Sequence, residues 1–234
     1  MIPATIETHQ GIRVVRDDLL PGGSKTRFLP ILMEGADEVV YGSPFCGGAA
    51  VALSTIGKRT GQRVTLFYAK RNELHPRQRM AILNGATVYQ VPFGYMSNVQ
   101  SKARLYANKT GSRFIPLGFD VPAARKAFSA AILEVLAEES PDEIWCATGS
   151  GLLARCIATA RPDVTVQAVA VGLASRWAGE PMPKNVRVRQ ASLAFEKPCK
   201  ATAPFPCCPN YDRKAWEICR RESRGNALFW NVLG

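Results

Sequence analysis

Lys25 is the first candidate for chemistry in this sequence. It follows Gly22, Gly23 and Ser24 where a helix is predicted to start. The positive end of the helix dipole disfavours an ammonium group at such a place. That environment suits an amine whose pKa must fall so that it can act as a nucleophile. A solvated surface lysine is the alternative interpretation.

A second candidate is an anion site within residues 143–160. This stretch is predicted as a strand, then Gly149-Ser150-Gly151, then a helix. Small residues between a strand and a helix let backbone N–H groups approach a phosphate at the positive helix end. The segment has neither the lysine of a P-loop nor the GxGxxG spacing, so no nucleotide-binding fingerprint matches. A tight turn is the plain alternative.

Alternating strands and helices must position these residues. Helices are predicted over 25–34, 47–60, 77–83, 98–108, 123–139, 152–160 and 211–223, and strands over 12–15, 38–42, 63–69, 87–92, 143–148, 166–172 and 227–232. The Pro-rich stretch 173–210 is predicted to be irregular, with one strand at 186–190. Repeated strand–helix units with apolar strands predict an α/β fold with parallel sheets covered by helices.

Composition excludes several classes of protein. The chain has 234 residues, of which 47% are hydrophobic and 21% charged, as in an ordinary globular protein. It holds no apolar run of about 18 residues that could span a membrane, and its N-terminus lacks the pattern of a secretory signal. Seven cysteines and two histidines at loose spacings favour neither a disulfide scaffold nor a zinc site. We therefore expect a reduced, cytoplasmic setting and no metal.

The formal net charge of +11 is concentrated in two blocks. Residues 57–113 carry eleven basic residues against one acid, Glu73, and residues 176–234 carry eleven against five. The other two parts of the chain are mildly acidic. Such blocks predict a surface that binds a polyanion through its phosphates. No zinc-finger, RNA-recognition or basic-zipper signature is present that would indicate another way of binding nucleic acid. A solvated basic face is the alternative.

Four motifs, taken in order, resemble the fold type II pyridoxal-phosphate enzymes, especially the aminocyclopropane-carboxylate deaminase and D-cysteine desulfhydrase group. RDDLLPGGSKTRFL at 16–29 is similar to the segment that carries the Schiff-base lysine, in the position of Lys25. The other three similarities are a phosphate loop at Thr148-Gly149-Ser150-Gly151-Leu152, a Tyr-acid-Gly-Lys-Ala segment at Tyr211-Asp212-Arg213-Lys214-Ala215, and a closing segment at Phe229-Trp230-Asn231-Val232-Leu233-Gly234. The resemblance spans nearly the whole chain.

The resemblance implies a tryptophan synthase β-like fold with two intimately linked lobes, formed by 1–45 plus 114–234 and by 46–113. It implies pyridoxal 5'-phosphate as cofactor and Lys25 as the catalytic residue that binds it covalently. The backbone N–H groups of 149–152 would bind the phosphate, Tyr211 would stack on the pyridine ring, and Asp212 would keep the ring nitrogen protonated. A helix N-cap beside a packed aromatic is the structural alternative for this pair.

Departures from the family pattern bear on the substrate. Gly47-Gly48-Ala49 replaces a Ser-Asn-Gln loop, Asn231-Val232-Leu233-Gly234 replaces His-Thr-Gly-Gly, and the stretch before Tyr211 is short. These changes predict an open, less polar pocket for a substrate bulkier than a free amino acid. Together with the basic charge, they resemble the compact phage enzymes of thymidine hypermodification.

That resemblance predicts an isomerase that converts N-linked glycyl-thymidine in DNA to its Cα-linked isomer. DNA would be the substrate, with the modified base flipped out of the duplex. The location would be the host cytoplasm, without a membrane partner, and a homodimer is compatible with this interpretation. The alternatives are a decarboxylase of the modified thymidine, a free-amino-acid lyase or deaminase of the same fold, and a non-catalytic DNA-binding relative.

Overall fold

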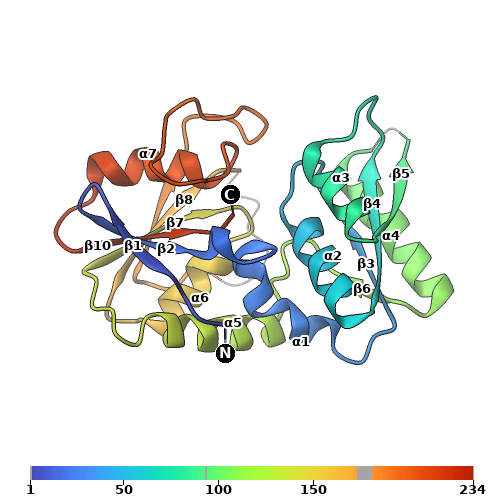
Figure 1. Cartoon of the computed structure of the whole chain (residues 1–234), viewed down its shortest axis with the longest axis horizontal. Coiled ribbons are helices and arrows are strands. Elements are labelled where there is room, and N and C mark those ends of the chain that lie inside the picture. The colour runs from blue at the N-terminus through green and yellow to red at the C-terminus, as the bar shows by residue number, and fades with distance from the viewer. Residues whose placement is uncertain (1, 93, 173–180, 234) are drawn as a thin grey trace. The chain divides into compact units, whose positions relative to one another are not determined.

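The computed structural model describes residues 2–92, 94–172 and 181–233 (Figure 1). The chain divides into two compact units. The first unit consists of Met1–Arg27 and Asp120–Gly234, and the second consists of Phe28–Phe119.

The first unit is built on a six-stranded sheet in the order β1-β2-β10-β7-β8-β9. The strands are β1 (Ile6–His9), β2 (Ile12–Arg16), β7 (Glu143–Thr148), β8 (Thr165–Ala170), β9 (Val186–Gln190) and β10 (Ala227–Asn231). All neighbouring strands are parallel except β1 and β2, which form an antiparallel hairpin. The central strands are apolar on both faces, as expected of a parallel sheet covered on both sides.

Within the described residues, three helices cover this sheet. Helix α7 (Asp212–Glu222) lies on one face, while α5 (Pro122–Val135) and α6 (Leu152–Ala160) lie on the other (Figure 1). Trp216 of α7 packs against Trp145 of β7 and Phe229 of β10, and all three side chains are fully buried. Two short 3-10 helices, η1 (Asp17–Leu19) and η2 (Gly23–Arg27), follow β2.

The second unit has a parallel four-stranded sheet in the order β5-β4-β3-β6. Its strands are β3 (Glu38–Gly42), β4 (Arg63–Ala69), β5 (Thr87–Val91) and β6 (Arg113–Ile115), and its helices are α1 (Leu29–Met33), α2 (Ala49–Thr60), α3 (Pro76–Leu83) and α4 (Met96–Thr110). Val99, Ala103 and Ala107 of α4 pack onto Val40 and Phe67. Helix α2 packs on the opposite face of the sheet (Figure 1).

This architecture confirms the predicted fold class, an α/β protein with parallel sheets covered by helices. The helix predicted over 25–34 was wrong as one element, because η2 ends at Arg27 and α1 starts at Leu29. Pro30 stands in the first turn of α1, where its missing N–H costs nothing, whereas inside a longer helix it would break a hydrogen bond. Strands β1 and β6 were not predicted, since both are short and carry little apolar pattern.

The unit boundaries differ from the predicted lobes, 1–45 plus 114–234 and 46–113. Strand β3 pairs with β4 through Val40 and Thr65 and with β6 through Val39 and Arg113, so it belongs to the sheet of the second unit. The second unit therefore extends from Phe28 to Phe119. The pairing of β3 with β4 and β6 sets this boundary, and strand pairing cannot be deduced from the local sequence.

Among the described residues, no helix has both the length and the apolar character needed to cross a membrane. All seven cysteines are free thiols with buried side chains. In the described parts of the chain, His, Cys, Asp and Glu side chains form no group of three or more that could hold a metal ion.

Candidate active site

Lys25 lies in η2 of the first unit, in a segment that packs against the end of β10. Its side chain is half-buried. The backbone N–H of Ser24 donates to the carbonyl oxygen of Val232 at 3.1 Å. Gly23 has a φ of +72°, and a Cβ there would collide with the same carbonyl oxygen. Only glycine allows this close approach, which sets Lys25 next to the C-terminal strand.

The predicted phosphate loop follows β7 and begins α6. Gly151 is the N-cap of α6 with a φ of +90° and has no side chain to cap the helix. Its N–H donates to Oγ1 of the buried Thr148 at 3.0 Å, and Gly149 is exposed. Leu152 is the first residue of α6. Backbone N–H groups at a helix start without a side-chain cap fit an anion such as phosphate.

Tyr211 lies directly beside this loop. Its phenol oxygen accepts the N–H of Gly149 at 2.9 Å, and its ring carbon would be 3.4 Å from a Cβ at that glycine. Burial, and then the charge of Asp212, raise the pKa of Tyr211 above its ordinary value. The phenol therefore stays neutral, and its ring forms one wall of the loop.

Asp212 is fully buried at the first position of α7. Its Oδ1 accepts the N–H of Val232 at 3.2 Å, and its Oδ2 accepts that of Leu233 at 3.3 Å. Hydrogen bonds of this kind favour the ionised carboxylate. The structural alternative, an N-cap of α7, is not what Asp212 does, because Tyr211 occupies the N-cap position without a side-chain cap bond.

The structure thus connects all the predicted site segments within the first unit. Val232 accepts from the Lys25 segment with its carbonyl oxygen and donates to Asp212 with its N–H. Tyr211, the neighbour of Asp212 in the chain, accepts from Gly149 of the loop. Hydrogen bonds, together with the peptide link between Tyr211 and Asp212, therefore connect the lysine segment to the loop between β7 and α6, although these residues are far apart in the sequence.

Two of the departures from the family pattern have clear positions. Gly47, Gly48 and Ala49 lie in the second unit, where Gly48 is the N-cap of α2 without a side-chain cap bond. Asn231 is fully buried at the end of β10, and its Nδ2 donates to the carbonyl oxygen of Pro206 at 2.8 Å. Within the described parts of the chain, its Oδ1 has no hydrogen-bond partner.

Asp17, Arg27 and Trp230 have a structural role that the sequence did not reveal. Arg27 pairs with Asp17, and both side chains are almost completely buried. The indole N–H of Trp230 also donates to Asp17, at 2.9 Å. These residues stood inside the recognised motifs, but their local sequence contains no signal that they contact one another.

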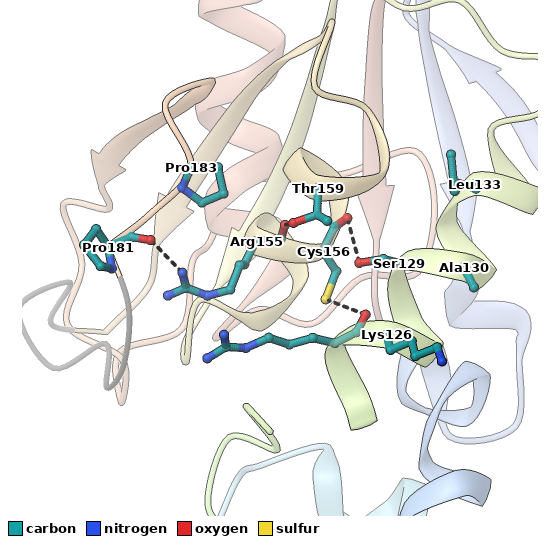
Figure 2. A pocket seen from close by; sticks show the side chains of 10 residues that line it. Lys126, Ser129, Ala130, Leu133, Arg155, Cys156, Thr159, Pro181 and Pro183 are labelled. Atoms are coloured by element: carbon teal, nitrogen blue, oxygen red, sulfur yellow. Dashed lines mark hydrogen bonds between the residues drawn. The ribbon is translucent and has the colours of Figure 1, made fainter. Parts of the chain in front are cut away.

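A cavity of about 510 Å³ lies against α5 and α6 (Figure 2). It is lined by basic and small side chains, Arg125, Lys126, Ser129, Ala130, Leu133, Arg155, Cys156, Thr159, Pro181 and Pro183. Asp120 lies between its two arginines, 2.5 Å from Nε of Arg125 and 3.7 Å from Nε of Arg155. None of the predicted site residues lines this cavity, and its arginines serve an ion-pair network that links α5 to α6.

The basic block 57–113 lies within the second unit. Lys70, Arg71 and Arg79 are exposed. The guanidinium of Arg71 lies 3.9 Å from the centre of the Phe45 ring. Arg77 differs from these three residues, because it is half-buried and its Nη1 donates to the carbonyl oxygen of Cys46 at 2.8 Å. Arg77, in α3, therefore has a structural role in holding the loop before α2.

Comparisons with known proteins agree with this fold. A solved structure of an aminocyclopropane-carboxylate (ACC) deaminase homologue superimposes with a TM-score of 0.83 and 19% identity, over 100% of this chain and 90% of that one. The structure of threonine deaminase isoform 2 from Solanum lycopersicum superimposes with a TM-score of 0.75 and 14% identity, over 99% of this chain and 79% of that one. A fungal L-serine ammonia-lyase from Rhizomucor miehei superimposes with a TM-score of 0.71 and 13% identity, over 99% of this chain and 92% of that one.

Sequence comparisons are less informative. No protein-family model matches the chain. Large ribosomal subunit protein bL21 of Cereibacter sphaeroides is 44% identical over 57 residues, which is 24% of this chain and 43% of that protein. The chain therefore spans less than half the length of the curated bL21 proteins that it matches. The structural likeness covers the whole chain, and it shows that the chain has the α/β fold of the fold type II pyridoxal-phosphate enzymes.

Proposed function

We propose that the chain is a pyridoxal-phosphate-dependent enzyme of fold type II that eliminates or deaminates an amino-acid substrate, with Lys25 as its catalytic residue. The observation that carries this proposal is the hydrogen-bonded connection of three segments. Ser24 is bonded to Val232, Val232 to Asp212, and the neighbouring Tyr211 to Gly149. A lysine, a carboxylate, an aromatic ring and an anion-binding loop are thereby gathered in one unit.

The residues fit the cofactor. The start of α6 has no side-chain cap bond at Gly151 and would bind its phosphate, although the N–H groups of Gly149 and Gly151 already donate to Tyr211 and Thr148. The ring of Tyr211 stands beside that loop. Asp212, whose two oxygens accept backbone N–H groups, is the group that would keep the pyridine nitrogen protonated. When bound, pyridoxal phosphate supplies an electron sink for a carbanion at the substrate Cα. Lys25 would hold the cofactor and exchange a proton at that carbon.

Free amino acids are the substrate class that the fold comparisons favour. The proteins of similar structure include a homologue of ACC deaminase, a threonine deaminase and an L-serine ammonia-lyase. Elimination and deamination both start from the Cα carbanion, so one arrangement of lysine and carboxylate serves either reaction.

Covalent attachment of the cofactor tests the proposal. Wild-type protein incubated with pyridoxal phosphate and reduced with borohydride should carry the cofactor on the peptide that contains Lys25. Lys25→Ala should lose this label and all turnover, whereas Lys126→Ala, at an exposed lysine of the same unit, should keep both. A label that stays on Lys25→Ala protein at the wild-type level would overturn the assignment.

A second candidate function is suggested by the charge of the second unit. Eleven basic residues stand against four acids between 28 and 119, and Lys70, Arg71 and Arg79 are exposed. Gly47-Gly48-Ala49 lacks the polar side chains that would hold a free carboxylate. We propose as this second candidate an isomerase of N-linked glycyl-thymidine in DNA, with a decarboxylase of the same substrate as its variant.

The two candidates are separated by substrate. The protein should be incubated with glycyl-modified DNA and, separately, with serine, threonine, D-cysteine and aminocyclopropane-carboxylate. Isomerisation leaves the mass of the nucleoside unchanged and creates a primary amine, while decarboxylation removes carbon dioxide. Turnover of free amino acids with inert DNA supports the deaminase or lyase. The opposite result supports the DNA-modifying enzyme.

A further inference from the structure

The residues on both sides of Lys25 belong to one closed ring of hydrogen bonds. The indole N–H of Trp230 points to two acceptors, Oδ2 of Asp17 at 2.9 Å and Oγ of Ser24 at 3.1 Å. Arg27 donates to the same Asp17 carboxylate from Nε at 3.0 Å and from Nη2 at 2.5 Å. The ring runs from Ser24 through Trp230 and Asp17 to Arg27. Lys25 stands in the short segment of chain that closes it.

This ring is buried, while the lysine between its members is more accessible. Asp17 is 1% exposed, Ser24 2% and Trp230 0%, and the side chain of Arg27 is 2% exposed. Removing one partner of a buried, hydrogen-bonded charge pair leaves the other charge uncompensated, so the ring resists rearrangement. Lys25 is only half-buried. A rigid frame therefore carries a lysine whose side chain reaches the surface.

The backbone adds two further constraints to the same segment. Ser24 donates its N–H to Val232 at 3.1 Å. The hydroxyl of Thr26 donates to the carbonyl oxygen of Gly23 at 2.7 Å. Together with the ring, these bonds fix the backbone immediately before and after Lys25 to β10 and to η1. The direction in which the lysine leaves the backbone is thereby determined.

We propose that Asp17 and Trp230 are positioning residues that set the direction of the Lys25 amine for its attachment to the cofactor. The proposal rests on the proposed function of Lys25. Attachment joins Nζ to the aldehyde carbon of pyridoxal phosphate as a C=N bond, and the aldehyde oxygen leaves as water with both amine hydrogens. Such a reaction needs the amine to lie close to its target position, which a rigid frame secures.

Trp230→Phe is the sharpest test, because it keeps an aromatic ring in the core and removes the N–H donor, together with part of the buried indole. Trp145→Phe is the matched control. Trp145 is equally buried in the neighbouring strand, and its indole N–H also donates to a carboxylate, that of Glu143 at 2.8 Å. The apparent affinity for pyridoxal phosphate should be measured from the visible absorption of the attached cofactor, and the attachment site from borohydride-fixed peptides. Trp230→Phe should weaken attachment about fivefold, as expected for one lost hydrogen bond, and Trp145→Phe should not.

A second, independent test uses the variant Asp17→Asn, with Asp18→Asn as its control. The side chain of Asp18 is also buried and pairs with Arg16, but it lies outside the ring. Asp17→Asn should weaken attachment more than tenfold. Thermal unfolding of all four variants without cofactor shows how much stability each has lost.

The outcomes separate this inference from the proposed function. Loss of attachment in the Trp230 and Asp17 variants, beyond that of equally destabilised controls, supports the positioning role. Attachment in Trp230→Phe at the wild-type level, or an equal loss in Trp145→Phe, overturns it while the proposed function stands. Absence of any attachment in wild-type protein overturns the proposed function and the positioning role together.

Discussion

The phenol oxygen of Tyr211 accepts a hydrogen bond from the backbone N–H of Gly149 at 2.9 Å. This bond joins the start of α7 to the loop between β7 and α6, across 62 residues of sequence. It places an aromatic ring beside a helix start, a position where an anion such as phosphate can bind.

Tyr211→Phe should separate the two contributions of this residue. The variant keeps the ring and loses the acceptor, so the free energy of unfolding should fall by about 1 kcal/mol. Stabilisation by inorganic phosphate should be equal to or larger than in wild-type protein, because the N–H of Gly149 is released for the anion. Urea unfolding with and without phosphate measures both effects, and Tyr95→Phe, at an exposed tyrosine, is the control. Weaker stabilisation by phosphate would mean that the hydroxyl itself contacts the anion.

Asp212→Asn should keep the cofactor but reduce turnover by about 10²- to 10⁴-fold, because a neutral amide cannot keep the pyridine nitrogen protonated. The amide NH₂ would also face a backbone N–H of Val232 or Leu233, so stability should fall by about 1–3 kcal/mol. Rates must therefore be compared at a temperature where both proteins are folded.

Asp163→Asn, at an exposed carboxylate of the same unit, is the control for this substitution. Unchanged turnover in Asp212→Asn would assign the protonating role to another group. Cys207 is a poor substitute, because burial raises its pKa to about 11 and the thiol stays neutral at physiological pH.

Charge reversal should test the basic surface of the second unit. Under the second candidate function, replacing Lys70, Arg71 and Arg79 with Glu should weaken binding of DNA and make it less dependent on salt, by about 0.9 in logarithmic slope for each phosphate that is no longer neutralised. Arg77 is left in place because its guanidinium supports the backbone at Cys46. Charge reversal at the exposed Lys126, which lies outside both basic blocks, is the control. If all variants bind DNA with the same affinity at every salt concentration, the basic block only keeps the protein soluble and does not bind DNA.

Glu38 should make the second unit sensitive to acid. Burial opposes its ionisation, but hydrogen bonds from Thr65, Ser112 and Tyr106 outweigh this and lower the pKa of the carboxyl below its ordinary 4.5. The ionised form is thus favoured in the folded state. Its contribution to stability is complete above pH 4.5 and is lost as the pH falls through the lowered value.

Glu38→Gln should therefore cost about 1–3 kcal/mol at neutral pH, since buried donors lose an acceptor, and the difference from wild type should shrink below pH 4.5. Urea unfolding between neutral and acid pH measures this difference. Glu73→Gln, at an exposed carboxylate of the same unit, should show no such trend. A difference that is constant with pH would show that the charge of Glu38 plays no part.

Much of the local structure followed from the sequence. The strands at 38–42, 63–69, 143–148 and 186–190 have the bounds that their apolar patterns and turns predicted. The order of the motifs pointed to the fold class, and the Gly-Ser-Gly turn of 149–151 lies between strand and helix as expected. These features depend on residues that are close in the chain, so their periodicity and turn chemistry are visible locally.

The tertiary structure alone decided which of these pieces meet. Asp17 and Trp230 lie 213 residues apart in sequence and share a hydrogen bond, because the last strand β10 is inserted between β2 and β7. The same insertion brings Val232 to both Ser24 and Asp212. Strand order in a sheet depends on the packing of all its helices and strands together, and the apolar pattern of one strand is the same whichever neighbours it has. The sequence therefore contained the parts of the site, while the order of the sheet determined the contacts between them.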